Sequence, residues 1–240
     1  MVLKILNVVL FIAMVYVNFL ANSLPINGQS TGEISNAYSN LFAPAGITFS
    51  IWGIIYLALG VSSVLLFKSN NKEILQSISW FYIFSSALNA IWIFAWHYNK
   101  FGLSVIIMLL LLISLIMINI KLSSHPNSII KASFGIYLGW ICIATIANIT
   151  VWLVSLNWSG FGLSEEIWTI LLIIIGLAIT VAAVAKFKNP FIALSVIWAF
   201  VGISIKQNGN SNAVFITALI SAILFTGILI FYIIKKPLES

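Results

Sequence analysis

The residues of this chain that could do chemistry are few, and most are aromatic rather than ionisable. Both histidines, His97 and His125, and all five carboxylate residues fall between long apolar runs or in the C-terminal tail. Ionisable residues deep inside membrane-spanning segments usually mark proton relays or ion paths, and none of these runs holds one in its core. No carboxylate pair, nucleophile–base pair or metal cluster can be assembled at a sensible depth. The sequence therefore argues against a proton pump, a hydrolase and a metalloenzyme.

Nine tryptophans are the most prominent side chains that remain. Trp52, Trp92 and Trp140 lie deep inside apolar runs, where each indole N–H needs a hydrogen-bond acceptor. Tryptophans nearer the ends of the runs are explained as anchors at the membrane interface. These interface tryptophans are Trp80, Trp158 and Trp168.

Two asparagines could serve the deep tryptophans. Asn89 precedes Trp92 by three residues and shares its helix face, so we expect it to accept the Trp92 N–H. Asn148 lies two turns beyond Trp140 and should point into a bundle, because an amide facing lipid is costly. Buried rings with isolated amides fit an apolar ligand pocket that has a few orienting polar groups. They fit a helix interface stabilised by polar contacts equally well.

Residues 44–67 contain the aromatic residues with the clearest spacing. The segment has no charged side chain and is long enough to cross about 30 Å of hydrocarbon at about 1.5 Å per residue. Pro44 lacks an N–H and suits a helix start, so we expect the helix to begin there. One helix face then carries two large rings, a phenol and a gap, which suits a flat aromatic ligand or a closely packed partner helix. These face residues are Phe49, Trp52, Tyr56 and Gly60.

The composition defines the fold class. The chain is 62% hydrophobic and 7% charged, with a mean hydropathy of +1.13. A soluble domain of this composition would have almost nothing to cover its core. We therefore expect an all-α polytopic membrane helix bundle of about eight transmembrane helices. The predicted spans are 5–24, 44–67, 76–96, 101–120, 133–155, 167–185, 190–205 and 212–234.

The lysines support the count of eight. With the N-terminus in the cytoplasm, nine lysines fall inside, and only Lys100 and Lys206 fall outside, as the positive-inside rule requires. The span 190–205 is short and begins at a proline, so it would cross with little tilt, thin the bilayer or be re-entrant. The first span is too long for a signal peptide, and we expect an uncleaved helix. The inside lysines are Lys4, Lys68, Lys72, Lys121, Lys131, Lys186, Lys188, Lys235 and Lys236.

The longest connection, residues 25–43, has two interpretations. Loops of nearly 20 residues are usually functional or flexible. Its apolar residues, among them Ile34 and Phe42, could fold over the mouth of the bundle as a lid, or the loop could be a passive connector. At the same end, His97 could act as an axial haem ligand, although an interfacial histidine in an aromatic belt explains it better.

Three segments give the chain a family resemblance. The first is Pro44-Ala-Gly-Ile-Thr-Phe-Ser-Ile-Trp52, the second is Asn89-Ala-Ile-Trp92, and the third runs from Tyr137 through Trp140 and Ala144 to Asn148. Their order and spacing resemble the translocator protein family, also called the tryptophan-rich sensory proteins, over about residues 1–155. The resemblance implies a five-helix bundle in residues 1–155. Residues 156–240 would then add three transmembrane helices and a short cytoplasmic tail.

The resemblance also implies a function. Members bind tetrapyrroles or other flat apolar ligands between their helices, so no cofactor is required, and haem or protoporphyrin is the expected kind of ligand. One departure concerns the mouth, where Ala43-Pro44-Ala45 stands in place of the family's double proline. Another is that no basic residue follows Trp152, so cholesterol binding is not expected. The ligand-binding residues indicated by the resemblance and by the helix faces together are Phe49, Trp52, Tyr56, Asn89, Trp92, Trp140, Ala144 and Asn148.

We therefore expect a non-enzymatic protein that binds a flat hydrophobic ligand for sensing, sequestration or transport. A permease without a charge-coupled site, a membrane enzyme acting on a porphyrin or lipid through His97, and a structural role are the alternatives. The expected partners are the lipid bilayer and a small hydrophobic ligand, with no nucleic acid. Gly53 and Gly60 would suit a homodimer face or packing within one chain. We expect the protein in a bacterial cytoplasmic membrane, and the lysine distribution predicts that both termini lie inside.

Overall fold

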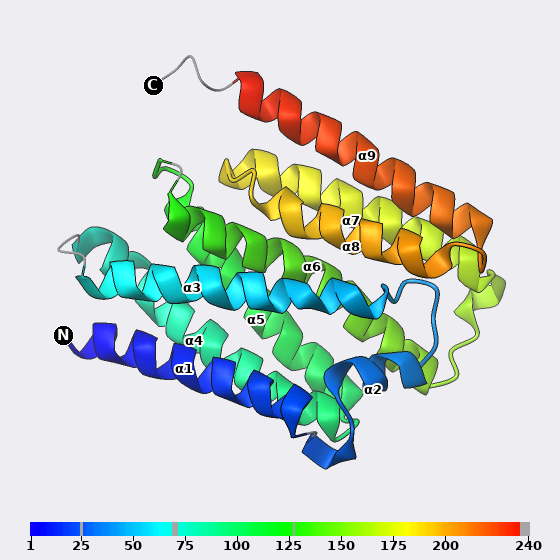
Figure 1. Ribbon diagram of the computed structural model, residues 1–240, viewed down its shortest axis with the longest axis horizontal. Coiled ribbons are helices and arrows are strands. Elements are labelled where there is room, and N and C mark those ends of the chain that lie inside the picture. The colour runs from blue at the N-terminus through cyan, green and yellow to red at the C-terminus, as the bar shows by residue number, and fades with distance from the viewer. Residues whose placement is uncertain (25, 69–71, 127, 236–240) are drawn as a thin grey trace.

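The computed structural model describes residues 1–24, 26–68, 72–126 and 128–235, and within these ranges the secondary structure is helical (Figure 1). Pro25, Lys236 and Glu239 lie outside the described residues. The all-α class and the polytopic bundle are therefore confirmed. The helices are α1 Val2–Ser23, η1 Ile26–Gly28, α2 Thr31–Ala37, η2 Gly46–Ser50, α3 Ile51–Lys68, α4 Lys72–His97, α5 Phe101–Leu122, α6 Ile129–Ser155, η3 Gly160–Gly162, α7 Glu165–Phe187, α8 Ile192–Gln207 and α9 Asn212–Lys235.

Five of the long helices form a closed ring. α1 packs on α3 and α4, α4 on α5, α5 on α6, and α6 returns to α3. The apolar core of this ring includes Ile55, Tyr82, Leu111 and Tyr137, each of which is fully buried. Many other apolar side chains point outward, as expected for helices whose outer faces meet lipid. The ring is the frame in which the deep tryptophans meet.

The three C-terminal helices form a second group beside the ring (Figure 1). α7, α8 and α9 pack on one another, and α8 is the member that lies most extensively against α6. The approach is close at Gly139, where an added Cβ would collide with the Ile192 carbonyl and the Ser195 hydroxyl. Ser195 Oγ also donates to the Ile136 carbonyl at 2.8 Å. A glycine on α6 therefore lets the backbones of α6 and α8 come together.

The predicted spans correspond to helices in the structure. Seven of the described helices are long and apolar enough to cross a membrane, and α8, with 16 residues, is shorter. The chain is an integral membrane protein. In Figure 1 the start of α1 and the end of α9 lie at the same end of the molecule. Helix α8 therefore runs the length of the bundle in the direction opposite to α7 and α9.

One predicted boundary was wrong. The second span does not begin as an α-helix at Pro44, because Ala45 precedes a 3-10 helix over Gly46–Ser50 and the α-helix begins at Ile51. The Ala45 N–H donates to the Gly202 carbonyl of α8 at 2.9 Å instead of entering a helix. A contact made far away in the sequence therefore sets where this helix starts.

Candidate functional site

The predicted aromatic face of the second span forms one wall of a site inside the ring. Trp52 stacks on Tyr56 one turn along α3, with ring centroids 5.4 Å apart. Trp140 of α6 meets Trp52 edge-on at 6.1 Å, and Phe49 meets Trp140 edge-on at 6.2 Å. Stacked and edge-on pairs are the favoured arrangements of aromatic rings. The structure thus joins four of the predicted site residues in one cluster.

The opposite wall comes from α4. Trp92 and Trp96 are buried and stack with centroids 5.5 Å apart. Trp92 Nε1 donates to Asn148 Oδ1 at 2.7 Å, and the Asn148 side chain also exchanges hydrogen bonds with the Ser104 hydroxyl of α5. The expectation that Asn89 would accept the Trp92 N–H was wrong, because the acceptor is the amide of Asn148 on α6. Asn148 points into the bundle, as predicted.

Asn89 lies beneath the cluster rather than at its surface. Its Oδ1 accepts from Asn18 Nδ2 at 2.7 Å, and its Nδ2 donates to the Tyr137 hydroxyl at 2.9 Å. Tyr137 in turn lies edge-on to Trp52 at 6.0 Å. Asn89 is fully buried and does not border the cavities described next. Its direct effect is therefore on the positions of Asn18 and Tyr137.

Two neighbouring cavities open between these walls and share Thr31, Phe49, Trp52 and Trp92. The larger has a volume of about 270 Å³, and the smaller, of about 60 Å³, reaches Ala144 and Asn148. Pro44 borders the smaller cavity, and residues of α2 border both. Of the eight predicted site residues, the cavities bring together Phe49, Trp52, Tyr56, Trp92, Trp140, Ala144 and Asn148.

Two polar groups at these cavities have no hydrogen-bond partner among the described residues. They are Trp140 Nε1, on a side chain only 4% exposed, and the Tyr56 hydroxyl. An unpaired donor in an apolar interior costs about 1–3 kcal/mol. A ligand that offers a hydrogen-bond acceptor at this point would remove that cost.

The connection before α3 covers the end of the ring and contains α2. A capping box starts this short helix: Ser30 Oγ accepts from the Glu33 N–H, and Glu33 Oε2 accepts from the Ser30 N–H at 2.7 Å. The Ser30 backbone N–H that donates to the carboxylate, and to a smaller extent the Ser30 side chain, hold the pKa of the Glu33 carboxyl below its usual value of 4.5. Ile34 on the inner face is 1% exposed. The segment is therefore folded against the bundle.

His97 fastens this connection to α4. It is fully buried, so the expectation of an interfacial histidine was wrong. Nδ1 lies 3.0 Å from the Ile26 carbonyl and Nε2 lies 3.0 Å from Thr31 Oγ1. The Ile26 carbonyl can only accept, so Nδ1 carries the hydrogen of that bond, and Nε2 shares a hydrogen bond with the Thr31 hydroxyl. With both nitrogens engaged, His97 has none left for an axial haem bond in this conformation.

Helix α8 supports the other side of the site, which the sequence did not indicate. Trp198 Nε1 donates to the Thr48 carbonyl at 2.9 Å, and Gln207 Nε2 donates to the Leu41 carbonyl at 2.9 Å. Together with the Ala45–Gly202 bond, they hold the segment that carries Pro44 and Phe49. The only sequence signals were a tryptophan and a glutamine on a short apolar helix. Neither identifies a partner about 150 residues away.

Fold and site together define a polytopic helical membrane protein with clustered aromatic residues in a five-helix ring. No group of histidine, cysteine or carboxylate residues within the described ranges could hold a metal ion. The family model described as TSPO-like protein matches residues 4–231, and the chain belongs to this family. The match confirms the resemblance and extends beyond residue 155 across α7 and α8 and into α9. No curated protein and no solved structure matches the chain.

Proposed function

We propose that the aromatic cavities bind a flat apolar ligand of the tetrapyrrole class that carries a hydrogen-bond acceptor. The observation that carries the proposal is the buried, unpartnered Trp140 N–H in a wall of aromatic rings. Rings on both walls can stack on a planar ligand, each contact contributing about 0.5–1.5 kcal/mol. A propionate or carbonyl oxygen of the ligand would accept from Trp140 Nε1 or Tyr56.

The cavities are small, so the proposal also requires a movement of the connection that covers them, which contains α2. Ligand pockets typically measure about 300–1,000 Å³, and the two cavities, of about 270 and 60 Å³, are each smaller than that. A tetrapyrrole would therefore enter only if α2 moves outward. The residues that would contact it are those predicted, with Asn89 acting through Tyr137 rather than by contact.

A titration tests the proposal. The full chain, purified in detergent, is titrated with protoporphyrin IX and with haem while tryptophan fluorescence is followed. We expect saturable quenching that is lost in Trp52→Leu and Trp140→Leu variants whose circular dichroism is unchanged. Trp80→Phe is the matched control, because Trp80 is 53% exposed on the outer face of α4. Quenching that does not saturate, or that persists in both folded variants, would contradict the proposal.

A second measurement separates binding from catalysis and transport. If the protein only binds, the absorption spectrum of bound protoporphyrin IX stays constant over hours, and protein-containing vesicles take up porphyrin no faster than empty ones. A new pigment that disappears with His97→Ala would favour the enzyme alternative. Accelerated uptake abolished by Trp140→Leu would favour a transporter.

A further inference from the structure

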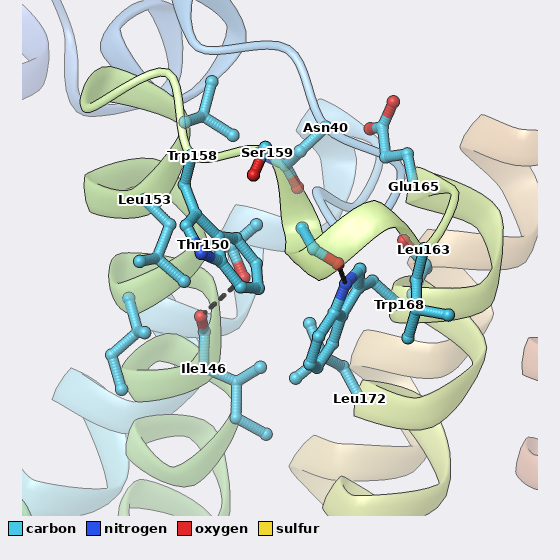
Figure 2. Close-up of a pocket in the computed structure, with 14 residues that line it drawn as sticks. Asn40, Ile146, Thr150, Leu153, Trp158, Ser159, Leu163, Glu165, Trp168 and Leu172 are labelled. Carbon is cyan, nitrogen blue, oxygen red and sulfur yellow. Dashed lines mark hydrogen bonds between the residues drawn. The ribbon is translucent and has the colours of Figure 1, made fainter.

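A further cavity lies outside the ring, between α6 and α7. The two helices diverge toward the end where residues 156–164 join them (Figure 1), and the space between them has a volume of about 370 Å³. It is larger than either cavity in the ring. Figure 2 shows Leu153 and Ile146 of α6 on one side, Trp168 and Leu172 of α7 on the other, and Trp158 of the connection above.

Two indoles give this cavity a fixed aromatic wall. The rings of Trp158 and Trp168 lie 5.1 Å apart at an angle of 56°. Trp168 Nε1 donates to the Gly160 carbonyl at 2.7 Å, which ties the connection to α7. Gly160 has a φ of +67°, and a Cβ there would lie 3.1 Å from Trp168 Nε1, so only glycine fits comfortably. The positions of the two indoles are therefore fixed by a hydrogen bond and by a glycine that the backbone conformation requires.

The face of α7 that borders the cavity changes from charged to apolar with depth. Glu165, Thr169 and Leu172 follow one another at helical spacing, and all three border the cavity. Thr169 is 3% exposed, and its hydroxyl makes no hydrogen bond to the rest of the described chain. The exposed Glu165 carboxylate stands at the mouth, where Oε1 accepts from the Leu41 N–H at 2.7 Å. A carboxylate, an unpaired hydroxyl and an apolar floor thus follow in order.

The charges indicate which occupant fits. No lysine or histidine of the described chain borders the cavity. Glu166, the neighbour of Glu165, is engaged by the Ser211 hydroxyl at 2.6 Å and adds a second negative charge nearby. A phosphate headgroup would be repelled here, whereas an ammonium group would be attracted by Glu165 and by the faces of the indoles.

We propose that this cavity, which we call the α6–α7 site, binds a lipophilic amine. The apolar body of the amine lies between Ile146, Leu153 and Leu172. Its ammonium group lies at the mouth, where the Glu165 carboxylate and the Thr169 hydroxyl accept its hydrogens. The site is separate from the aromatic cavities of the ring and does not depend on the function proposed for them.

Two matched fluorescent probes test this proposal on the full chain in detergent. N-dansyl-1,6-hexanediamine carries a primary amine, and N-hexyl dansylamide has the same body and chain without the charge. Binding is followed by energy transfer from tryptophan to dansyl. We expect saturable binding of both, with the amine about threefold to fivefold tighter, the range for an exposed carboxylate and an ammonium.

The variants remove the polar groups one at a time. In Glu165→Gln the amide oxygen can still accept from Leu41, but the charge is gone, so the preference for the amine should fall, and only the smaller contributions of Thr169 and the indoles should remain. Thr169→Val keeps the shape and should weaken only the amine. Leu172→Trp should exclude both probes by filling the cavity. Comparing two probes on the same variant cancels any general effect on folding.

The proposal is overturned if the wild-type protein binds both probes equally or if Glu165→Gln leaves the preference unchanged. Transfer that does not saturate, as expected for a probe in the detergent or an apolar cavity filled by any lipid, overturns it as well. Trp140→Leu separates the sites: it should abolish porphyrin binding and leave the amine preference intact. Loss of amine binding in this variant would place the amine in the ring and refute the α6–α7 site alone.

Discussion

Buried polar groups at the site fall into two kinds, those with partners and those without. Asn148 belongs to the first kind, because it accepts from Trp92 Nε1 at 2.7 Å and bonds to Ser104. Trp140 belongs to the second, since its N–H meets no acceptor in the described chain. The polar groups with partners should determine the stability of the fold. The polar groups without partners should determine the affinity for the ligand.

Asn148→Leu tests how much the hydrogen bonds of a partnered buried group contribute to stability. The change leaves the Trp92 N–H and the Ser104 hydroxyl facing an apolar side chain, so the free energy of unfolding should fall by about 1–3 kcal/mol. Denaturant titration in detergent, followed by circular dichroism, measures it. Asn208→Leu, in the exposed connection after α8, is the control and should change it by less than about 0.5 kcal/mol. Equal effects of the two substitutions would contradict the assignment.

Trp140→Phe tests whether the unpartnered N–H of Trp140 contributes to ligand affinity. It removes the N–H and keeps an aromatic ring, so the affinity for protoporphyrin IX, which has carboxylates, should fall by about 0.5–1.5 kcal/mol more than the affinity for an alkyl-substituted porphyrin without them. Fluorescence titration of both ligands gives the ratio. An unchanged ratio would show that Trp140 contributes only packing.

At the scale of elements, α8 determines how the segment before α3 is held. An added Cβ on Gly202 would overlap the Thr48 side chain, so Gly202→Ala should lower the free energy of unfolding by about 1–3 kcal/mol. Thr48→Ala removes the overlapping hydroxyl and methyl groups and should restore part of the loss, because the hydroxyl is buried without a described partner, although the Thr48 Cβ would still lie 2.8 Å from the added Cβ. Thermal unfolding of the single and double variants measures both effects. Gly227→Ala, where nothing lies within 4 Å, is the control and should be neutral or stabilising. A Gly202→Ala/Thr48→Ala double variant no more stable than Gly202→Ala would refute the contact between Gly202 and Thr48.

The short helix α2 should respond to pH through its capping box. The folded-state pKa of Glu33 lies below its usual value of 4.5, so the carboxylate stabilises the helix above that pH and loses this effect as the pH falls through the folded pKa. Hydrogen exchange of residues 31–37, corrected for intrinsic rates, should therefore show protection at neutral pH that declines in acid. Glu33→Ala should exchange faster at neutral pH and show no such decline. A decline that persists in this variant would assign the effect to another group.

At the scale of the whole molecule, the apolar runs predicted the helices because each run is a local property of the chain. The aromatic face of α3 and the inward direction of Asn148 were predictable for the same reason, since both follow from helical spacing. What the sequence missed involves partners distant along the chain. Trp198 Nε1, for example, donates to the carbonyl of Thr48, 150 residues earlier in the chain. The burial of Lys131 was also missed, although its partner is close in sequence. This side chain, expected as an inside charge, is 2% exposed, and its Nζ donates to the His125 carbonyl at 2.8 Å.

Whether helix α8 crosses the bilayer decides on which side α9 begins, and α8 is short for a crossing. Its 16 residues span about 24 Å, less than the roughly 30 Å of hydrocarbon in a typical bilayer. The buried polar groups Gln207 and Ser204 near its end make the shortfall tolerable, because they face protein rather than lipid. We therefore expect α8 to cross, with local thinning of the bilayer.

Single cysteines introduced into a Cys142→Ser background measure this crossing with a membrane-impermeant maleimide on intact bacterial cells. Tyr98→Cys, after α4, and Asn208→Cys, after α8, should be labelled from outside, whereas Ser124→Cys, between α5 and α6, should react only after permeabilisation. Labelling of Asn208 and Ser124 together, opposite to Tyr98, would mean that α8 turns back within the membrane. Inversion of the whole pattern would preserve the eight crossings and reverse the orientation that the lysines predict.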